Sequence, residues 1–149
     1  EPSLVPLVCV GGPGWRTDDL TCLIAADPEL RGKLILLGGL ADDDLGWLYR
    51  HCAFTLYPSF FEGWGLPVAE SLAYGKYCVA TTAPSVAELS RGVLDLLDPL
   101  DFAVWHREVR RLLTDPGYLR TKERRIAGYR PRSWVEAGEQ FVAETAGFR

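Results

Sequence analysis

Residues 54–76 of this 149-residue chain read FTLYPSFFEGWGLPVAESLAYGK, and this stretch decides the fold. It begins with an apolar run that predicts a strand ending at Tyr57, and it continues through a turn that contains two glycines. A helix is expected to begin at Pro67, because proline lacks the N–H that the first turn of a helix leaves unused. A strand, a turn and a helix in this order are typical of a parallel α/β sheet.

Two carboxylates, Glu62 and Glu70, flank this turn with seven residues between them. The start of a helix presents unused backbone N–H groups and the positive end of the helix dipole, which together attract anions. Carboxylates are poor ligands for phosphate but good acceptors for sugar hydroxyls. Taken singly, Glu62 is explained as a surface loop residue and Glu70 as a first-turn acid. Their joint placement at the end of a buried strand favours a ligand with both phosphate and hydroxyls, such as a nucleotide sugar.

Outward from this stretch, apolar runs alternate with segments of helical periodicity. This alternation predicts right-handed crossovers and one domain, 1–149, of the α/β class, with a Rossmann-like parallel sheet and helices on both faces. The continuous apolar runs at 4–10 and 34–37 predict strands buried on both faces. The expected strands are 4–10, 34–37, 54–57, 78–81 and 93–97. Helices are expected from the cap Thr17 to 27, over 42–52 with three aspartates in the first turn, from 67, over 84–89 and from the cap Asp101. After a turn at 115–117, two more helices are expected over 118–128 and 133–146, the last with Ser133 as its cap and Glu136 at the capping-box position.

Composition narrows the classes of protein. A net charge of −4 with 48% apolar and 24% charged residues is ordinary for a globular chain and argues against a nucleic-acid binder. The sequence contains no run of eighteen apolar residues, so no transmembrane helix is predicted. No signal peptide is visible either, and we therefore expect a cytoplasmic domain. The chain begins with Glu1 and contains no Met, which suggests a piece of a longer protein. The basic stretch 107–132 is explained by polar helix faces, with contact to the inner face of an anionic membrane as the alternative.

The glycine turn after the first strand, Gly11–Gly14, lacks the GxGxxG pattern of dinucleotide-binding proteins, so nicotinamide and flavin cofactors are not expected. The turn still permits close approach of a phosphate near Gly12. Arg16 follows it and is expected either to reach phosphate oxygens or to lie in solvent before the helix.

No metal site is expected. His51 and His106 are far apart in the sequence, and the four cysteines form no CxxC pair. Asp95, Asp98 and Asp101 have a spacing that suggests metal ligands, but turn and cap chemistry explain it.

Residues 62–75, EGWGLPVAESLAYG, resemble the hallmark of retaining GT-B glycosyltransferases of family 4, the glycosyl transferases group 1 type. That hallmark is E-G-aromatic-G-L-P-x-x-E followed by a small residue, an apolar residue and A-x-G. The likeness covers nearly the whole chain. It also includes residues 44–50 (DLGWLYR), 58–59 (PS), 85–88 (SVAE), 98–101 (DPLD), 112–116 (LLTDP) and 133–134 (SW).

The resemblance implies the C-terminal, nucleotide-sugar-binding domain of a two-domain enzyme whose N-terminal acceptor domain is absent from this chain. Glu70 would hold the ribose hydroxyls of the donor. Glu62 would be catalytic, holding the transferred sugar and stabilising the reacting centre. Gly12 stands where the family often carries an Arg, and Arg16 would replace that residue. Diphosphate and sugar would be held by backbone N–H groups of Gly63, Trp64, Gly65 and Leu66.

The resemblance further implies transfer of a hexose, mannose or a related sugar, from a UDP- or GDP-sugar to a glycan or lipid-linked acceptor with retention. Polysaccharide biosynthesis is the expected setting, and the isolated domain is expected to bind donor without appreciable transfer. Two alternatives remain. One is a non-catalytic nucleotide or nucleotide-sugar binding module, and the other is an interaction domain that kept the fold and lost the site.

Overall fold

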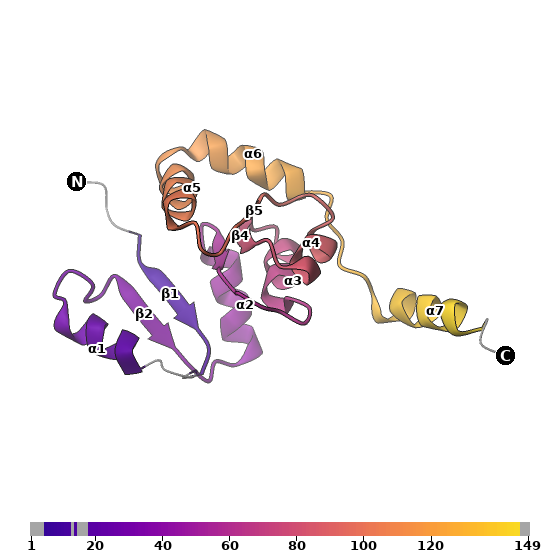
Figure 1. Ribbon diagram of the computed structural model, residues 1–149, viewed down its shortest axis with the longest axis horizontal. Helices are drawn as coiled ribbons and strands as arrows, with labels where there is room; N and C mark the ends of the chain where they lie inside the picture. The colour runs from indigo at the N-terminus through magenta and orange to yellow at the C-terminus, as the bar shows by residue number, and fades with distance from the viewer. Residues whose placement is uncertain (1–4, 13, 15–17, 147–149) are drawn as a thin grey trace. The chain divides into compact units, whose positions relative to one another are not determined.

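A computed structural model describes residues 5–12, 14 and 18–146 of the chain. Two compact units are present, Glu1–Leu48 and Tyr49–Arg149, and they are described separately (Figure 1). The boundary between them falls inside helix α2, Asp42–His51. As predicted, the first turn of α2 is acidic, with three consecutive aspartates that suit the positive end of the helix dipole.

The unit Glu1–Leu48 contains a parallel pair of strands. Strand β1, Leu7–Val10, pairs with β2, Leu34–Leu37, in a register that sets Leu7 opposite Leu34. Helix α1, Asp18–Ala26, lies between the two strands in sequence, as a parallel crossover requires. The predicted cap Thr17 lies outside the described residues.

The predicted burial of these two strands is wrong. Leu7 is 46% exposed, Val10 is 44% exposed and Leu36 is 45% exposed. Burial on both faces requires a packed layer on each face, and no residue of α1 is buried. Among the described residues, the parallel strands form two hydrogen-bonded groups, β1-β2 and β3-β4-β5.

The unit Tyr49–Arg149 is built on the second sheet, which is also parallel. Its central strand β4 is hydrogen-bonded along both edges, and all four residues of β4 are buried. The α/β class with parallel strands and flanking helices is therefore confirmed. The remaining elements are β3 Thr55–Tyr57, α3 Leu66–Ala73, β4 Cys78–Thr81, α4 Pro84–Ser90, β5 Leu96–Leu97, α5 Phe102–Thr114, α6 Pro116–Ile126 and α7 Trp134–Thr145.

The hydrophobic core of this unit joins the sheet to four helices. In Figure 1 the strands β4 and β5 lie between the pair α3–α4 and the pair α5–α6. Each large apolar side chain that is fully buried stabilises the fold by about 1.5–3 kcal/mol. The core residues are Val68, Ala69, Leu72, Tyr77, Cys78, Val79, Ala80, Ala83, Val86, Leu89, Leu94, Leu112 and Ile126.

Two predicted helix caps are confirmed. The Asp101 carboxylate accepts the N–H of Val104 at 3.0 Å and begins α5. Ser133 and Glu136 form a reciprocal capping box that begins α7. The predicted turn at Asp115 is instead a third cap, because its carboxylate accepts the N–H of Tyr118 at 2.9 Å and α6 begins at Pro116.

An ion-pair network joins Asp95, the residue directly before β5, to α6. The Asp95 carboxylate accepts one hydrogen bond from the buried Lys122 ammonium, and each of its two oxygens accepts a hydrogen bond of 2.8 Å from Arg125. The Tyr77 hydroxyl donates to it at 3.2 Å, and Glu108 lies 3.6 Å from Lys122. Burial alone would raise the pKa of Asp95, but the hydrogen bonds from Lys122 and Arg125 outweigh it and hold that pKa below its ordinary value.

We expect Asp95→Asn to lower the free energy of unfolding at pH 7 by about 1 kcal/mol, a modest figure because solvent screens a half-exposed carboxylate. A lowered folded-state pKa stabilises the fold above the ordinary aspartate pKa, and this contribution is lost as pH falls through the lowered value. Urea denaturation at pH 7 and pH 3 should therefore show a difference between wild type and variant that shrinks at pH 3. A difference of the same size at both pH values contradicts this assignment.

Candidate functional site

The glycine turn ahead of α3 is fixed at Gly65. This residue has φ 90° and ψ 49°, in the left-handed region that side chains other than glycine rarely adopt. It is also buried, and a Cβ placed there would lie 3.3 Å from Cγ2 of Val86. Gly65 therefore meets two requirements at once, a left-handed backbone and close packing against α4.

The N-terminus of α3 presents open hydrogen-bond donors. The N–H groups of Val68 and Ala69 both donate to the Gly65 carbonyl, at 3.0 and 3.3 Å. Within residues 5–12, 14 and 18–146, the four preceding N–H groups donate to no backbone carbonyl. These are the groups of the predicted donors Gly63, Trp64, Gly65 and Leu66. A helix start with open N–H groups is a favourable place for an anion.

Glu62 precedes this turn and is held from two sides. The Ser59 hydroxyl donates to its Oε1 at 2.9 Å, and the Ser85 hydroxyl of α4 donates to its backbone carbonyl at 2.9 Å. Burial raises the pKa of Tyr57, and a hydrogen bond to Glu62 and the charge of Glu62 raise it further. Glu62 is half-buried, so its carboxylate has a defined orientation and remains open to a ligand.

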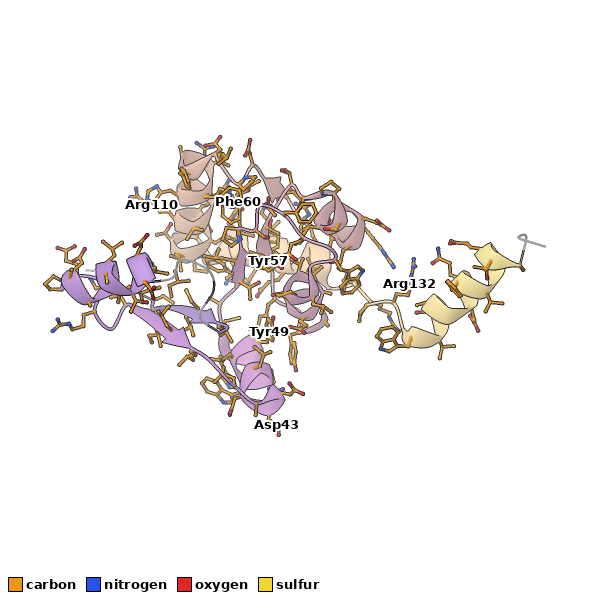
Figure 2. All side chains as sticks on the ribbon, turned by 60° about the horizontal axis from the view of Figure 1, so that its bottom comes forward. Asp43, Tyr49, Tyr57, Phe60, Arg110 and Arg132 are labelled. Atoms are coloured by element: carbon orange, nitrogen blue, oxygen red, sulfur yellow. The ribbon has the colours of Figure 1, made fainter. Side chains whose placement is uncertain are left out.

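Glu70 lies in the second turn of α3 and is also half-buried. Its Oε2 accepts a hydrogen bond of 2.9 Å from the Tyr49 hydroxyl. Tyr49, from α2, and Tyr57, from β3, are labelled in Figure 2. Both predicted carboxylates therefore accept hydrogen bonds from hydroxyl groups, on opposite sides of one turn in the sequence.

The other predicted site residues belong to the unit Glu1–Leu48. Gly12 follows β1, is exposed, and has nothing within 4 Å of a Cβ built on it, so the backbone is accessible there. Arg16 lies outside the described residues, and its role in binding phosphate stays a prediction.

Sequence reasoning missed the residues that hold the two glutamates. Ser59 and Ser85 belong to the sequence motifs quoted above, but the sequence alone predicted no role for them. The helical periodicity of 42–52 sets Tyr49 on the apolar face of its helix, and the position of its hydroxyl depends on packing that periodicity does not show. The useful signal was the polar group at one end of an otherwise apolar side chain, which needs a partner when it is buried.

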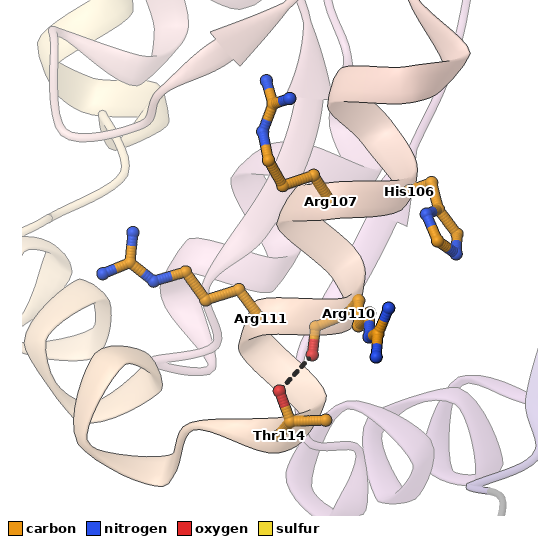
Figure 3. Close-up of a pocket in the computed structure, with 5 residues that line it drawn as sticks. All are labelled: His106, Arg107, Arg110, Arg111 and Thr114. Carbon is orange, nitrogen blue, oxygen red and sulfur yellow. Dashed lines mark hydrogen bonds between the residues drawn. The ribbon is translucent and has the colours of Figure 1, made fainter.

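A concave surface lies on α5. A depression of about 290 Å³ is lined by His106, Arg107, Arg110, Arg111 and Thr114. These five side chains are drawn in Figure 3. The Arg111 guanidinium packs 3.7 Å from the ring centre of Tyr118, and the Thr114 hydroxyl donates to the Arg110 carbonyl at 2.8 Å. This surface is basic and contains neither predicted glutamate, and it suits an extended anionic partner.

Three further observations concern metals, thiols and membranes. Within the described part of the chain, no three His, Cys, Asp or Glu side chains are placed to hold a metal ion. The four cysteines are unpaired, and burial raises the pKa of the Cys78 thiol to about 11. Among the described helices, none has the length and apolar character needed to span a bilayer.

Comparison with known proteins agrees with the family resemblance of residues 62–75. Residues 2–115 match the family described as glycosyl transferases group 1. The chain is 29% identical to O-antigen chain mannosyltransferase B of Escherichia coli over 138 residues, which are 92% of this chain and 36% of that protein. It is 32% identical to the serotype-specific mannosyltransferase WbdA of Escherichia coli over 70% of this chain and 13% of that protein. A D-inositol 3-phosphate glycosyltransferase of Salinispora arenicola is 34% identical over 77% of this chain and 27% of its own length.

The extent of the family match shows that the chain belongs to the glycosyl transferases group 1 family. Its parallel α/β fold is consistent with the Rossmann-like C-terminal half of a GT-B glycosyltransferase. The chain spans about a third or less of the relatives named above.

We expect Gly65→Ala to lower the free energy of unfolding by about 1–3 kcal/mol, because alanine is strained at this φ and its Cβ crowds Val86. Gly63→Ala is the matched control, since Gly63 is exposed and has open space around its Cβ position. Thermal denaturation of both variants should show a clear loss for Gly65→Ala and little change for Gly63→Ala. Equal stability of the two variants would contradict the packing role of Gly65.

Proposed function

We propose that residues 1–149 form the donor-binding domain of a glycosyltransferase that transfers a hexose from a nucleoside diphosphate sugar. One observation carries this proposal. Glu62 and Glu70, each hydrogen-bonded to a hydroxyl group, flank a turn whose N–H groups are open at the start of α3. Such an arrangement suits a ligand with phosphates for the N–H groups and hydroxyls for the carboxylates.

Each group has one role in this proposal. Glu70 accepts the ribose hydroxyls, and Glu62 accepts hydroxyls of the transferred sugar. The N–H groups of residues 63–66 bind the diphosphate, and no cofactor or metal takes part. Gly12 allows a phosphate to approach the backbone, and Arg16 adds a positive charge.

Catalysis follows from positioning and electrostatics. The departing diphosphate gains negative charge as its bond to the sugar breaks, and the N–H groups at the start of α3 stabilise that charge. The sugar gains positive, oxocarbenium-like character, and the carboxylate of Glu62 stabilises it. A carboxylate already fixed by Ser59 needs little reorganisation during the reaction. We infer that transfer proceeds with retention, as in family 4 enzymes.

The relatives suggest the sugar and the acceptor. Two of them carry the name mannosyltransferase, and one name includes the O-antigen chain. We infer mannose or a related hexose as the transferred sugar, GDP or UDP as the carrier, and a glycan or lipid-linked acceptor of polysaccharide biosynthesis. Because the chain spans only 36% of the first of these relatives, an N-terminal domain is proposed to bind the acceptor. This domain alone should then bind donor and transfer little.

In one alternative function, the domain binds a nucleotide sugar but takes no part in catalysis. Gly12 stands where the family often carries an arginine, which favours a non-catalytic nucleotide-sugar binding module. Turnover by the full-length protein separates the two functions, whereas donor binding is common to both.

Substituting the two glutamates tests the proposal. Ligand-observed NMR with UDP, GDP and their hexose conjugates should detect binding to this chain, and Glu70→Ala should weaken nucleotide binding about tenfold through lost hydrogen bonds. In the full-length enzyme, Glu62→Ala should reduce kcat more than it weakens donor binding.

Glu139→Ala is the control, because Glu139 is an exposed residue of α7. Absence of nucleotide binding by the wild-type chain at millimolar concentration would disprove the donor site. Turnover by Glu62→Ala at the wild-type level would remove Glu62 from the mechanism.

We also propose that the basic surface of α5 contacts an anionic membrane. His106, Arg107 and Arg110 are exposed on one helix, and each arginine near an anionic bilayer contributes about 1 kcal/mol of attraction. This contact would bring the donor domain close to a lipid-linked acceptor.

The double variant Arg107→Gln/Arg110→Gln should weaken binding to vesicles that contain anionic phospholipid by about tenfold or more. Arg111 is left in place because it packs on Tyr118. Cosedimentation at low and high salt measures the effect, and Arg120→Gln/Arg124→Gln on α6 is the matched charge control. Equal binding of both double variants would argue against a specific role for α5.

A further inference from the structure

The Tyr49 hydroxyl lies at the edge of the proposed donor site. It is 2.9 Å from Oε2 of Glu70 and 3.5 Å from the carbonyl oxygen of Pro67. A phenol has one proton to donate, and the shorter distance, together with the charge of a carboxylate, directs that proton to Glu70. The carbonyl contact is too long to compete.

Tyr49 remains a donor throughout the physiological pH range. Burial raises the pKa of its phenol, and the hydrogen bond to Glu70 and the charge of Glu70 raise it further. A protonated phenol beside a carboxylate can only donate, so Oε2 of Glu70 receives a fixed partner before any ligand is present.

The ring of Tyr49 is itself held in place. It stacks on the ring of Tyr74 with 5.2 Å between the ring centres and 13° between the planes. The guanidinium of Arg50 lies 5.8 Å from the centre of the Tyr74 ring. Tyr74 directly follows α3, so the ring stacking and the hydrogen bond join Tyr49 to the same helix at two points.

We propose that Tyr49 is a positioning residue for recognition of the ribose by Glu70. By occupying Oε2, the hydroxyl fixes the rotation of the carboxylate and leaves Oε1 for the ligand. Among the described residues, Oε1 accepts no hydrogen bond. This inference rests on the proposed role of Glu70 and extends it to a residue on α2.

A carboxylate that is hydrogen-bonded on one oxygen recognises hydroxyls differently from one that rotates freely. It has about four lone-pair sites, of which the phenol occupies one in a fixed direction. Ligand hydroxyls then meet an acceptor whose geometry is already set, and less rotamer freedom is lost on binding. Loss of the phenol should therefore affect ligands that have ribose hydroxyls and spare ligands that lack them.

The test compares Tyr49→Phe with wild type for binding of GDP, UDP and their 2′,3′-dideoxy analogues, measured by NMR titration of this chain. The variant keeps the ring and its stacking and loses only the hydroxyl. We expect its affinity for the ribonucleotide to fall about three- to tenfold, and its affinity for the dideoxy analogue to remain unchanged. In a Glu70→Ala background, Tyr49→Phe should cause no further loss, as a double-mutant cycle requires for groups that act together.

Tyr118→Phe is the matched control. It removes a hydroxyl that donates to another glutamate, Glu108, at 2.9 Å on α5 and α6, and it should leave nucleotide affinity unchanged. If wild type binds no nucleotide, the proposed function fails and this inference fails with it. If Glu70→Ala weakens binding but Tyr49→Phe does not, or if Tyr49→Phe weakens both kinds of ligand equally, the proposed function stands and the positioning role of Tyr49 is wrong.

Discussion

The contact between Gly65 and Val86 is the constraint on which the site depends. Gly65 has a left-handed conformation at the point where the loop becomes a helix, and because it has no Cβ this point can pack closely against Val86 of α4. As a result α3 begins with its N–H groups open, with Glu62 on one side of the turn and Glu70 on the other. Ser85, the neighbour of Val86, binds the backbone of Glu62, so α4 supports the turn at two adjacent residues.

This support is effective because α3 and α4 rest on a well-packed sheet. Strand β4 is buried along its whole length, and Val68, Leu72 and Val86 pack against it in one core. Directly before β5, Asp95 anchors α6 through the buried Lys122, and the strands lie between the two helix pairs. The apolar core and the ion pairs thus stabilise the scaffold, while the groups proposed to meet a ligand lie in a loop and a helix start at its surface.

Much of this architecture is readable in the sequence, since strand and helix positions follow from apolar runs, capping residues and glycine turns. The pair of glutamates around 63–66 was also readable, because spacing and residue type show them. The exposure of β1 and β2 could not be predicted from the sequence. An apolar run indicates that a strand can be buried, but it does not show whether another layer covers it. The bond between Tyr49 and Glu70 was equally hidden, because it depends on how α2 meets α3 across 21 positions of sequence.

The paired hydroxyl and carboxylate groups have a thermodynamic consequence. Ser59 and Tyr49 restrict the rotamers of two glutamates while the protein folds, so the entropy of ordering those side chains is lost at that stage. Part of the stability of the core therefore offsets a cost that a flexible site would meet at each binding event. A donor site of the kind proposed above would then lose less side-chain entropy when it binds its ligand.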